Sequence, residues 1–230
     1  MSGQLINARD IQDNGQQEQW DSFWARRGFF DLLNDFFRTL RGYFLLRRLH
    51  QYIAVPSFCE IGCGSAIFLA QVARYAHKVT GIDNSSVALT RARALFDDQG
   101  IQNGTVIVDD CRDLKIEERF DTVWSDGVIE HFDDPGKIIF EHLKITKNGG
   151  RTIISAPYKY SYKYIWYILT RPKFLRRWWP WTDQVFFTKK FMCECFEKYC
   201  GMYQWQYRIV ISHVSEDVIL FVKKETKNLN

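Results

Sequence analysis

The sequence predicts an α/β protein built on a doubly wound sheet. Two observations support this prediction. Short apolar runs alternate with helical patterns from residue 57 to residue 155, and a glycine-rich turn joins the first run to the first helix. Because strands and helices alternate, the strands are expected to lie parallel, with helices on both faces of the sheet. The chain of 230 residues, 46% of them hydrophobic, is long enough to bury one such core.

The first strand and its turn indicate which ligand the sheet binds. Residues 57–61 form the strand, the turn reads Glu60-Ile-Gly-Cys-Gly, and apolar residues predict a helix over 66–76. In a turn that binds a dinucleotide, backbone N–H groups meet a pyrophosphate and a third glycine lets the helix pack closely. Here Ile67 takes the third position and Glu60 adds negative charge. S-adenosylmethionine, which carries a ribose, an α-amino group, a sulfonium and no phosphate, is the better match.

The next two strands both lead to carboxylates. Residues 77–83 predict a second strand that ends at Asp83, where nucleotide-binding folds place a residue that binds ribose hydroxyls. Residues 104–108 predict a third strand, and the carboxylates that follow at 109–110 can bind an adenine amino group. Both positions lie at the carboxyl ends of strands, which is where doubly wound sheets bind their ligands.

Two helices and a fourth strand complete the alternating region. Ser85 or Ser86 can cap a helix after the second strand. Residues 120–124 predict the fourth strand, and the segment 125–132 that follows is polar where a buried strand should open into a crevice. A further helix is expected over 136–144.

Four ordered motifs give the chain a family resemblance. It resembles the class I S-adenosylmethionine-dependent methyltransferases, in the small-molecule branch (methyltransferase types 11 and 12) that includes the ubiquinone and menaquinone methyltransferases. The segment 147–157 is similar to the family's turn and fifth strand, and the resemblance covers residues 55–157. The motifs are Glu60-Ile-Gly-Cys-Gly-Ser, Gly81-Ile-Asp-Asn, Val108-Asp-Asp-Cys-Arg-Asp-Leu and Phe120-Asp-Thr-Val-Trp-Ser-Asp-Gly-Val-Ile-Glu-His-Phe.

The resemblance implies a complete fold. It predicts a Rossmann-like sheet of seven strands, parallel except for one antiparallel strand. Residues 203–212 and 217–223, rich in β-branched and aromatic side chains, look like the family's closing hairpin. Residues 53–230 are then one methyltransferase domain. Residues 1–52 are an N-terminal extension, helical from about residue 20, that packs on the core and in this family often covers the cofactor and substrate.

The resemblance also implies a binding site for S-adenosylmethionine, with S-adenosylhomocysteine as product and no metal. The backbone of Gly62, Cys63 and Gly64 is expected to approach the methionyl end of the donor, and Glu60 to orient that end directly or through water. Asp83 is expected to bind the ribose, with Asn84 or Ser85 beside the adenine and Asp110 and the Cys111 backbone on the adenine edge. The main-chain carbonyl of Ser125 or Asp126 is expected to hold the amino group.

Methyl transfer mainly requires that the acceptor atom is aligned with the methyl group of the donor, and that the acceptor loses its proton. His131 is the best-placed candidate base because imidazole titrates near neutral pH, and Glu130 is a weaker rival. His131 can equally hold its loop through a backbone hydrogen bond. The acceptor is expected to be a small aromatic, lipophilic or sugar molecule methylated on oxygen or nitrogen.

The segment 158–181 should determine the choice of acceptor. It mixes aromatic and basic residues, contains no acidic residue, and belongs to a lid insertion over 158–187. Tyr158, Tyr160 and Trp166 are the candidate substrate residues. The same composition suits peripheral membrane contact, or a helix whose rings simply pack on the core. Single-stranded nucleic acid is the least favoured partner, and no stable complex with it is expected at a net charge of +4.

Cysteine and arginine positions bear on location and on partners. Cys59, Cys63 and Cys111 fall inside the cofactor motifs, which indicates a reducing, cytoplasmic compartment, and no apolar run approaches the ~18 residues of a membrane span. The three cysteines over 193–200 lack a clear fourth metal ligand. The arginines over 26–48 are assigned to a solvated helix face, with pairing to an acidic substrate as the alternative. A monomer or a homodimer is expected.

Two other functions remain open. The chain could bind S-adenosylmethionine as a regulatory protein without transferring a methyl group, although no motif looks inactivated. It could also be an NAD(P)-dependent oxidoreductase, which Glu60 and Ile67 argue against.

Overall fold

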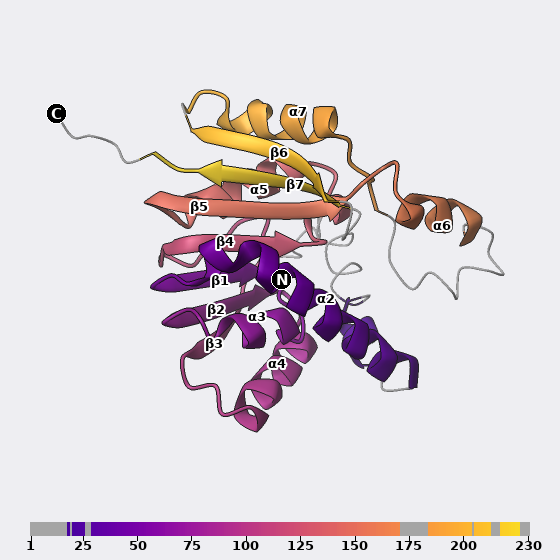
Figure 1. The fold of residues 1–230 in the computed structure, drawn as a ribbon, viewed down its shortest axis with the longest axis vertical. Helices are drawn as coiled ribbons and strands as arrows, with labels where there is room; N and C mark the ends of the chain where they lie inside the picture. Colours follow the sequence, from indigo (N-terminus) through magenta and orange to yellow (C-terminus); the bar gives the residue numbers. More distant parts are fainter. Residues whose placement is uncertain are drawn as a thin grey trace, which may run out of the picture.

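One mixed sheet forms the centre of the protein. The structure, a computed structural model, describes residues 18, 20–25, 29–170, 184–203, 205–212 and 217–225. Within these residues seven strands lie in the order β3-β2-β1-β4-β5-β7-β6 (Figure 1). The strands are β1 Ser57–Ile61, β2 Lys78–Asp83, β3 Gly104–Val108, β4 Phe120–Asp126, β5 Thr146–Pro157, β6 Gln206–Ser212 and β7 Asp217–Lys223.

The strand directions confirm the predicted doubly wound fold. β1 pairs in parallel with β2 and with β4, and β2 pairs in parallel with β3. β4 pairs in parallel with β5, whereas β7 runs antiparallel to both β5 and β6, so the expected closing hairpin is present. The strand order reverses between β1 and β4, and a crevice at their carboxyl ends is the expected ligand site of such a sheet.

Helices cover both faces of the sheet (Figure 1). α2, α3 and α4 share a core cluster with β1 and β2, while α5 and α7 share another with β5 and β7. Their bounds are α2 Phe29–Ile53, α3 Ile67–Val72, α4 Ser86–Asp98, α5 Pro135–Lys144, α6 Tyr162–Thr170 and α7 Lys189–Cys200, and a short 3₁₀ helix, η1, spans Ile129–His131. In the described part of the chain, no helix has both the length and the apolar character that crossing a membrane requires.

α3 is shorter than the sequence pattern predicts. The prediction of a helix over 66–76 is wrong at its end, because the α-helix stops at Val72 and turns follow. The Asn103 side chain accounts for the early end: its amide donates to the carbonyls of Ala73 and Ala76, at 2.9 and 3.0 Å. Carbonyls held by a side chain no longer need to continue the helical ladder.

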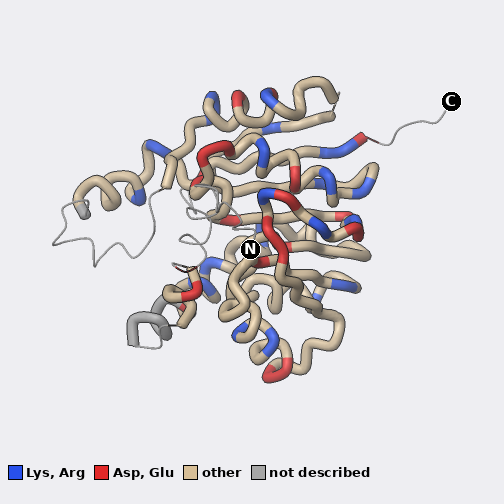
Figure 2. Tube along the Cα trace, turned by 180° about the vertical axis from the view of Figure 1, so that it is seen from behind, with Lys and Arg blue, Asp and Glu red and all other residues tan. Residues whose placement is uncertain are grey.

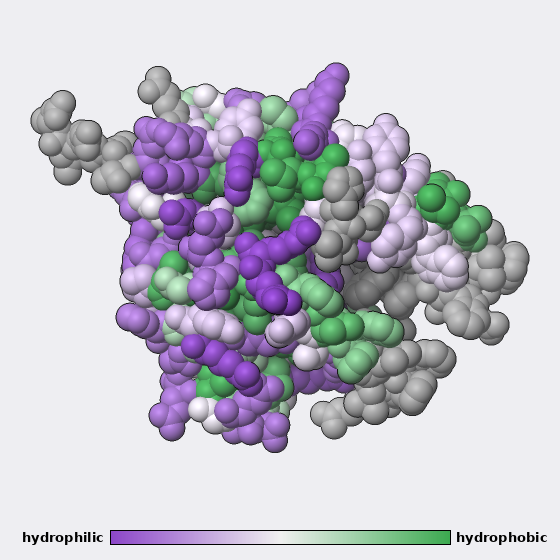
Figure 3. Space-filling model, in the orientation of Figure 1, coloured by the Kyte–Doolittle hydropathy of each residue, from purple (hydrophilic) through white to green (hydrophobic). Residues whose placement is uncertain are grey.

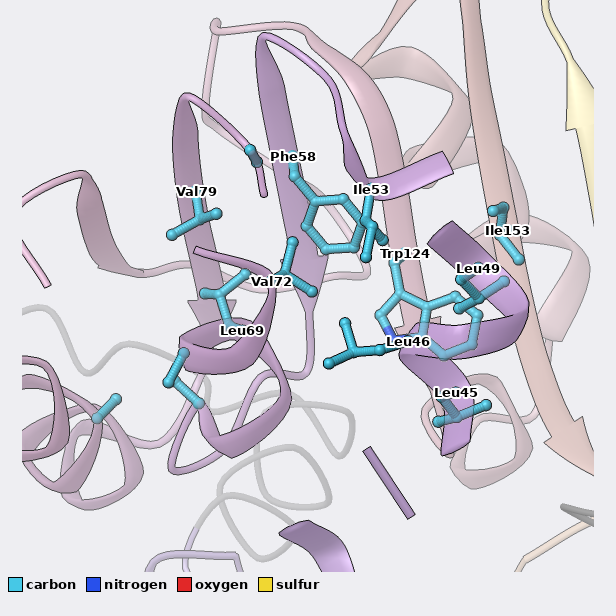
Figure 4. Close-up of a cluster of buried hydrophobic side chains, with 14 of the residues drawn as sticks. Leu45, Leu46, Leu49, Ile53, Phe58, Leu69, Val72, Val79, Trp124 and Ile153 are labelled. Atoms are coloured by element: carbon cyan, nitrogen blue, oxygen red, sulfur yellow. The ribbon is translucent and has the colours of Figure 1, made fainter. Parts of the chain in front are cut away.

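The packing of α2 determines what its earlier turns can reach. Its last three turns bury Leu45, Leu49 and Ile53 against Trp124 of β4, which is 1% exposed (Figure 4). Residues four apart share a helix face, so Arg41 lies one turn before Leu45 on the same buried face. α2 therefore carries Arg41 toward the carboxyl end of the sheet.

Candidate methyl-donor and acceptor site

A cavity of about 800 Å³ opens at the carboxyl ends of the central strands. Its wall comes from the turn after β1, the ends of β2 and β4, the beginning of β7, and α2 and α6. This is the crevice that the strand order predicts. The predicted site residues that line it are Glu60, Gly62, Cys63, Gly64, Asp83, Asn84, Cys111, Asp126, Glu130 and His131.

At Gly62 and Gly64 the turn after β1 presents only backbone to its neighbours. Gly62 and Gly64 have φ angles of 69° and 54°, a region that other residues rarely adopt. A Cβ built on Gly62 would lie 2.3 Å from Cγ2 of Val128, and one built on Gly64 would lie 2.4 Å from Cζ2 of Trp24. The N–H groups of Gly62 and Cys63 both donate to the Ile82 carbonyl, at 2.7 and 3.1 Å, which fixes the turn to β2.

Replacing Gly64 with alanine should lower the thermal stability of the protein clearly more than replacing Gly100. Both glycines have positive φ, so each substitution costs roughly 1–2 kcal/mol for the left-handed backbone. Only Gly64 adds a clash, since the space around Gly100 is open, and overpacking costs about 1–3 kcal/mol more. Thermal unfolding followed by circular dichroism measures both variants, and equal losses would contradict the close packing of Trp24 on the turn.

Glu60 is a buried carboxyl group with an unsatisfied oxygen. Its side chain is on the second-last residue of β1, it is 6% exposed, and its Oε2 has no hydrogen-bond partner. Burial raises the pKa of Glu60 well above its ordinary value, and the charges of Asp126 and Asp83 raise it further, while Arg38 acts in the opposite direction. A buried, unpaired oxygen in a cavity wall is a site for a hydrogen-bond donor or a cation.

Asp83 ties the glycine turn to the end of β2. Its Oδ2 accepts the N–H of Gly64 at 2.9 Å, and its Oδ1 accepts the N–H of Ser85 at 2.9 Å. Burial raises the pKa of Asp83, although the hydrogen bonds from Ser85 and Gly64 oppose this shift. Each carboxylate oxygen has a further lone pair, so Asp83 can still accept hydrogen bonds from a diol.

Ser85 serves the helix and does not line the cavity. Its hydroxyl caps α4 by accepting the N–H of Ala88 at 3.2 Å, and it also donates to the Asp21 carboxylate. Asn84 does line the cavity. Of the two residues predicted to flank the adenine, the structure places only Asn84 at the wall.

Asp110 lies away from the cavity wall. Its carboxylate accepts from Nε of Arg112 at 2.9 Å and forms an ion pair with that guanidinium, whereas Asp109 and Cys111 on either side line the cavity. The Asp109 carboxylate also holds the following loop, because it accepts the N–H of Lys115 at 2.9 Å. The structure thus places Asp109 and not Asp110 at the cavity wall, because sequence spacing alone does not say which of two adjacent acids points inward.

The end of β4 supplies Asp126 to the wall and the loop after it supplies Glu130 and His131, while Ser125 of β4 is buried. Burial raises the pKa of Glu130 to about 8, and the charges of Asp126 and Asp217 act in the same direction. Glu130 Oε2 has no hydrogen-bond partner. The His131 ring is half-buried, with the Trp20 ring edge-on at 5.2 Å between centroids.

Three arginines of α2 line the cavity: Arg38, Arg41 and Arg48. The assignment to a solvated helix face is wrong for Arg38 and Arg41, which are half-buried. The Arg38 guanidinium lies over the Trp24 ring, 4.7 Å from its centroid. Arg41 makes an ion pair with both carboxylate oxygens of Asp126 and donates to Oδ2 of Asp217 at 2.7 Å. Burial acts to lower the pKa of Arg41, but these two carboxylates more than offset it and the net shift is upward.

The predicted acceptor residues are not the ones that the structure places at the cavity. Tyr158 packs in the core cluster around β5, and Tyr160 and Trp166 are 73% and 48% exposed. Tyr162 and Lys163 of α6 line the cavity instead. The rest of the expected lid, residues 171–183, lies outside the described residues, as do residues 1–17.

The cysteines over 193–200 belong to α7. Cys195 and Cys200 are buried in the core cluster that α7 shares with α5, β5 and β7. Across the described ranges, the structure contains no group of three or more His, Cys, Asp or Glu side chains that could hold a metal ion.

Sequence comparisons match the central part of the chain to a known family. Residues 59–154 match the family described as a methyltransferase domain. Two curated relatives are the ubiquinone biosynthesis O-methyltransferases of Alkalilimnicola ehrlichii, 32% identical over 48% of this chain and 45% of that protein, and of Hydrogenovibrio crunogenus, 29% identical over 65% and 61%. The matched part thus spans about half the length of these relatives.

Structural comparisons agree on the fold. The N-methyltransferase NodS from Bradyrhizobium japonicum, in complex with S-adenosyl-L-homocysteine, superposes over 91% of this chain and 98% of its own, with a TM-score of 0.63 and 18% identity. Magnesium protoporphyrin IX methyltransferase from Synechocystis, with the same product bound, superposes over 96% of both chains with a TM-score of 0.63 and 15% identity. Residues 59–154 therefore match a methyltransferase-domain family, and the described chain has the Rossmann-like fold of these two methyltransferases.

Proposed function

We propose that this protein transfers a methyl group from S-adenosylmethionine to an oxygen or nitrogen of a small acceptor. The observation that carries the proposal is the acidic cradle at the end of β1. Glu60 has a buried oxygen without a partner beside a turn in which Gly62 and Gly64 expose backbone. This arrangement disfavours a phosphate and suits a ligand with an amino group and a positive charge.

Different lining residues would contact different parts of the donor. Gly62, Cys63 and Gly64 would meet its methionyl end, with Glu60 directed at the same end. Asp83 would accept the ribose hydroxyls, and Asn84 would flank the adenine. When bound, the donor supplies a methyl group already activated on a sulfonium.

Arg38 extends this arrangement beyond the sequence motifs. Its guanidinium is held on the Trp24 ring and faces the cavity close enough to Glu60 to influence the pKa of that carboxyl. A guanidinium binds carboxylates well because its N–H groups form a planar fork. We assign Arg38 to the donor's carboxylate, with Asp126 or its carbonyl on the amino group.

His131 is the better candidate base at neutral pH. A base must be unprotonated to accept the acceptor's proton, and a Glu130 with a pKa of about 8 is mostly protonated at pH 7. Protonated Glu130 can instead donate a hydrogen bond to the acceptor. Both side chains line the cavity, as the proposal requires.

The wall near α2 supports an acceptor with apolar character. Phe37, Leu40 and Phe44 line the cavity while remaining 56%, 43% and 47% exposed, so an apolar surface continues from the outside into the site. The curated relatives are named as O-methyltransferases of ubiquinone biosynthesis. We therefore propose a lipophilic or aromatic hydroxyl as the first acceptor class to test, ahead of a sugar or an amine.

The test is transfer of labelled methyl. Purified protein is incubated with methyl-labelled S-adenosylmethionine and cell extract, and the label is measured in organic and aqueous phases. Label in the organic phase is the expected result, and label in the aqueous phase would exclude the lipophilic acceptor while retaining the enzyme. Tight donor binding with no labelled product in repeated extracts would identify a binding protein instead.

Membrane contact, cytoplasmic location and a monomeric or dimeric state remain predictions. Exposed apolar residues on α2 and α6, such as Phe36, Ile165 and Leu169, support contact with a lipid surface beside the cavity mouth. Figure 3 shows hydrophobic surface over both helices. Sedimentation with vesicles that contain anionic phospholipid measures this contact, and protein that stays in the supernatant would contradict it.

A further inference from the structure

Asp217, the first residue of β7, binds two cations from different parts of the chain. It is 2% exposed. Its Oδ1 accepts from Nζ of Lys163 in α6 at 2.8 Å, and its Oδ2 accepts from Nη2 of Arg41 in α2 at 2.7 Å. A carboxylate this deeply buried is stable only when it is paired, so both bonds hold their helices to one point on the sheet.

The bond from Lys163 is a principal attachment of α6. Figure 1 shows α6 standing out from the sheet beyond the end of β5. α6 also makes aromatic contacts, since the rings of Tyr164 and Tyr167 pack on Phe186, at 5.0 and 5.2 Å. Lys163, the one charged residue of α6, adds a link to the sheet itself, and Figure 2 shows no acidic residue along this helix.

Arg41 continues the connection to the donor half of the cavity. The same guanidinium that binds Asp217 also pairs with Asp126 at the end of β4. Asp126 in turn is close enough to Glu60 to raise the pKa of that carboxyl. Lys163, Asp217, Arg41 and Asp126 thus form a continuous chain of ion pairs, and all four line the cavity.

We propose that Asp217 is a positioning residue that holds α6, and with it the acceptor wall, in register with the donor half of the cavity through Lys163 and Arg41. The functional meaning of this role rests on the proposed methyl transfer, whereas the structural coupling does not. Tyr162, which lines the cavity next to Lys163, is the side chain placed by this attachment. Asp217 itself need not touch either substrate.

Hydrogen exchange of the full chain without ligands tests the coupling. Asp217→Asn and Lys163→Met are each expected to speed exchange in peptides covering 162–169 at least fivefold. The double variant should exchange no faster than Asp217→Asn, because both changes remove the same link. Asp121→Asn is the matched control: Asp121 pairs with Lys147 at 2.8 Å outside the cavity, so its loss should leave α6 unchanged.

Several outcomes separate this role from a general loss of structure. Unchanged exchange over α6 in a folded Lys163→Met variant would overturn the proposal, as would an equal effect of Asp121→Asn. Lys163 is 24% exposed, so this variant keeps the test decisive even when Asp217→Asn does not fold. Calorimetry with S-adenosylmethionine should show the donor Kd within twofold of wild type for Lys163→Met and a several-fold weaker Kd for Asp217→Asn, which also frees Arg41.

The two proposals fail in different ways. In the transfer assay, Lys163→Met should raise the KM for the acceptor with little change in kcat. A protein that transfers no methyl group but shows faster α6 exchange in these variants would retain the coupling and lose the proposed function. Methyl transfer by the wild-type protein, together with unchanged hydrogen exchange over α6 in the variants, would retain the proposed function and overturn the coupling.

Discussion

Replacing Asp83 with asparagine should weaken S-adenosylmethionine binding by roughly ten- to a hundredfold. The substitution removes charge-assisted hydrogen bonds, each of which contributes about 1.5–3 kcal/mol. It also places an NH₂ group against an N–H of Gly64 or Ser85, which the native carboxylate accepts at 2.9 Å. Isothermal titration calorimetry with S-adenosylmethionine measures the change.

Asp110→Asn is the informative comparison for this result. The sequence motif assigns Asp110 to the adenine, whereas the structure pairs it with Arg112 away from the cavity wall. The structure therefore predicts a donor Kd within about threefold of wild type for this variant. A loss as large as that of Asp83→Asn would show that Asp110 faces the donor, and an unchanged Kd for Asp83→Asn would refute the ribose assignment.

Replacing His131 with glutamine should lower the rate of methyl transfer by about 10²- to 10⁴-fold, the usual contribution of a general base. Donor affinity should stay close to wild type, because other residues are assigned to the donor. The rate is measured as initial label transfer at saturating donor. A loss below tenfold would favour the alternative in which His131 only holds its loop.

The pH dependence of the rate distinguishes His131 from Glu130. A base acts only when unprotonated, so the rate rises as pH increases through its pKa. Glu130 as the base would give a midpoint near its raised pKa of about 8. We expect no midpoint near 8 in wild type, and a pH profile that Glu130→Gln leaves unchanged and His131→Gln alters. A midpoint near 8 that disappears in Glu130→Gln would assign the base to Glu130.

The central fold could be predicted because its signals are local. The Gly62 and Gly64 turn, the Asp83 at the end of a strand and the Ser85 cap each depend on neighbours within a few residues. The alternation of strands and helices then leaves few arrangements, because parallel strands require crossover helices of fixed handedness. The closing hairpin was predictable from its composition and from the family resemblance.

The sequence predictions and the structure differ where residues far apart in the chain determine the local geometry. α3 ends early because of Asn103, thirty residues after Ala73, and no periodicity within the helix reports this bond. Asp109 and Asp110 are adjacent, so their sequence spacing does not determine which one faces the cavity. Tyr158, Tyr160 and Trp166 were candidates by composition, but the direction of α6 places Tyr162 and Lys163 at the wall instead.

The sequence by itself determined the sheet and most of the donor cradle, since short-range backbone geometry and strand-end position define both. Only the tertiary structure decided how the cavity is completed. Arg41 and Asp217 are 176 residues apart, and Lys163 and Asp217 are 54 apart. Such pairs form because packing of α2 and α6 brings charges together where burial leaves an unpaired carboxylate unstable. The need to pair a buried carboxylate is met between helices and strands that are distant in sequence, so it produces no local sequence pattern.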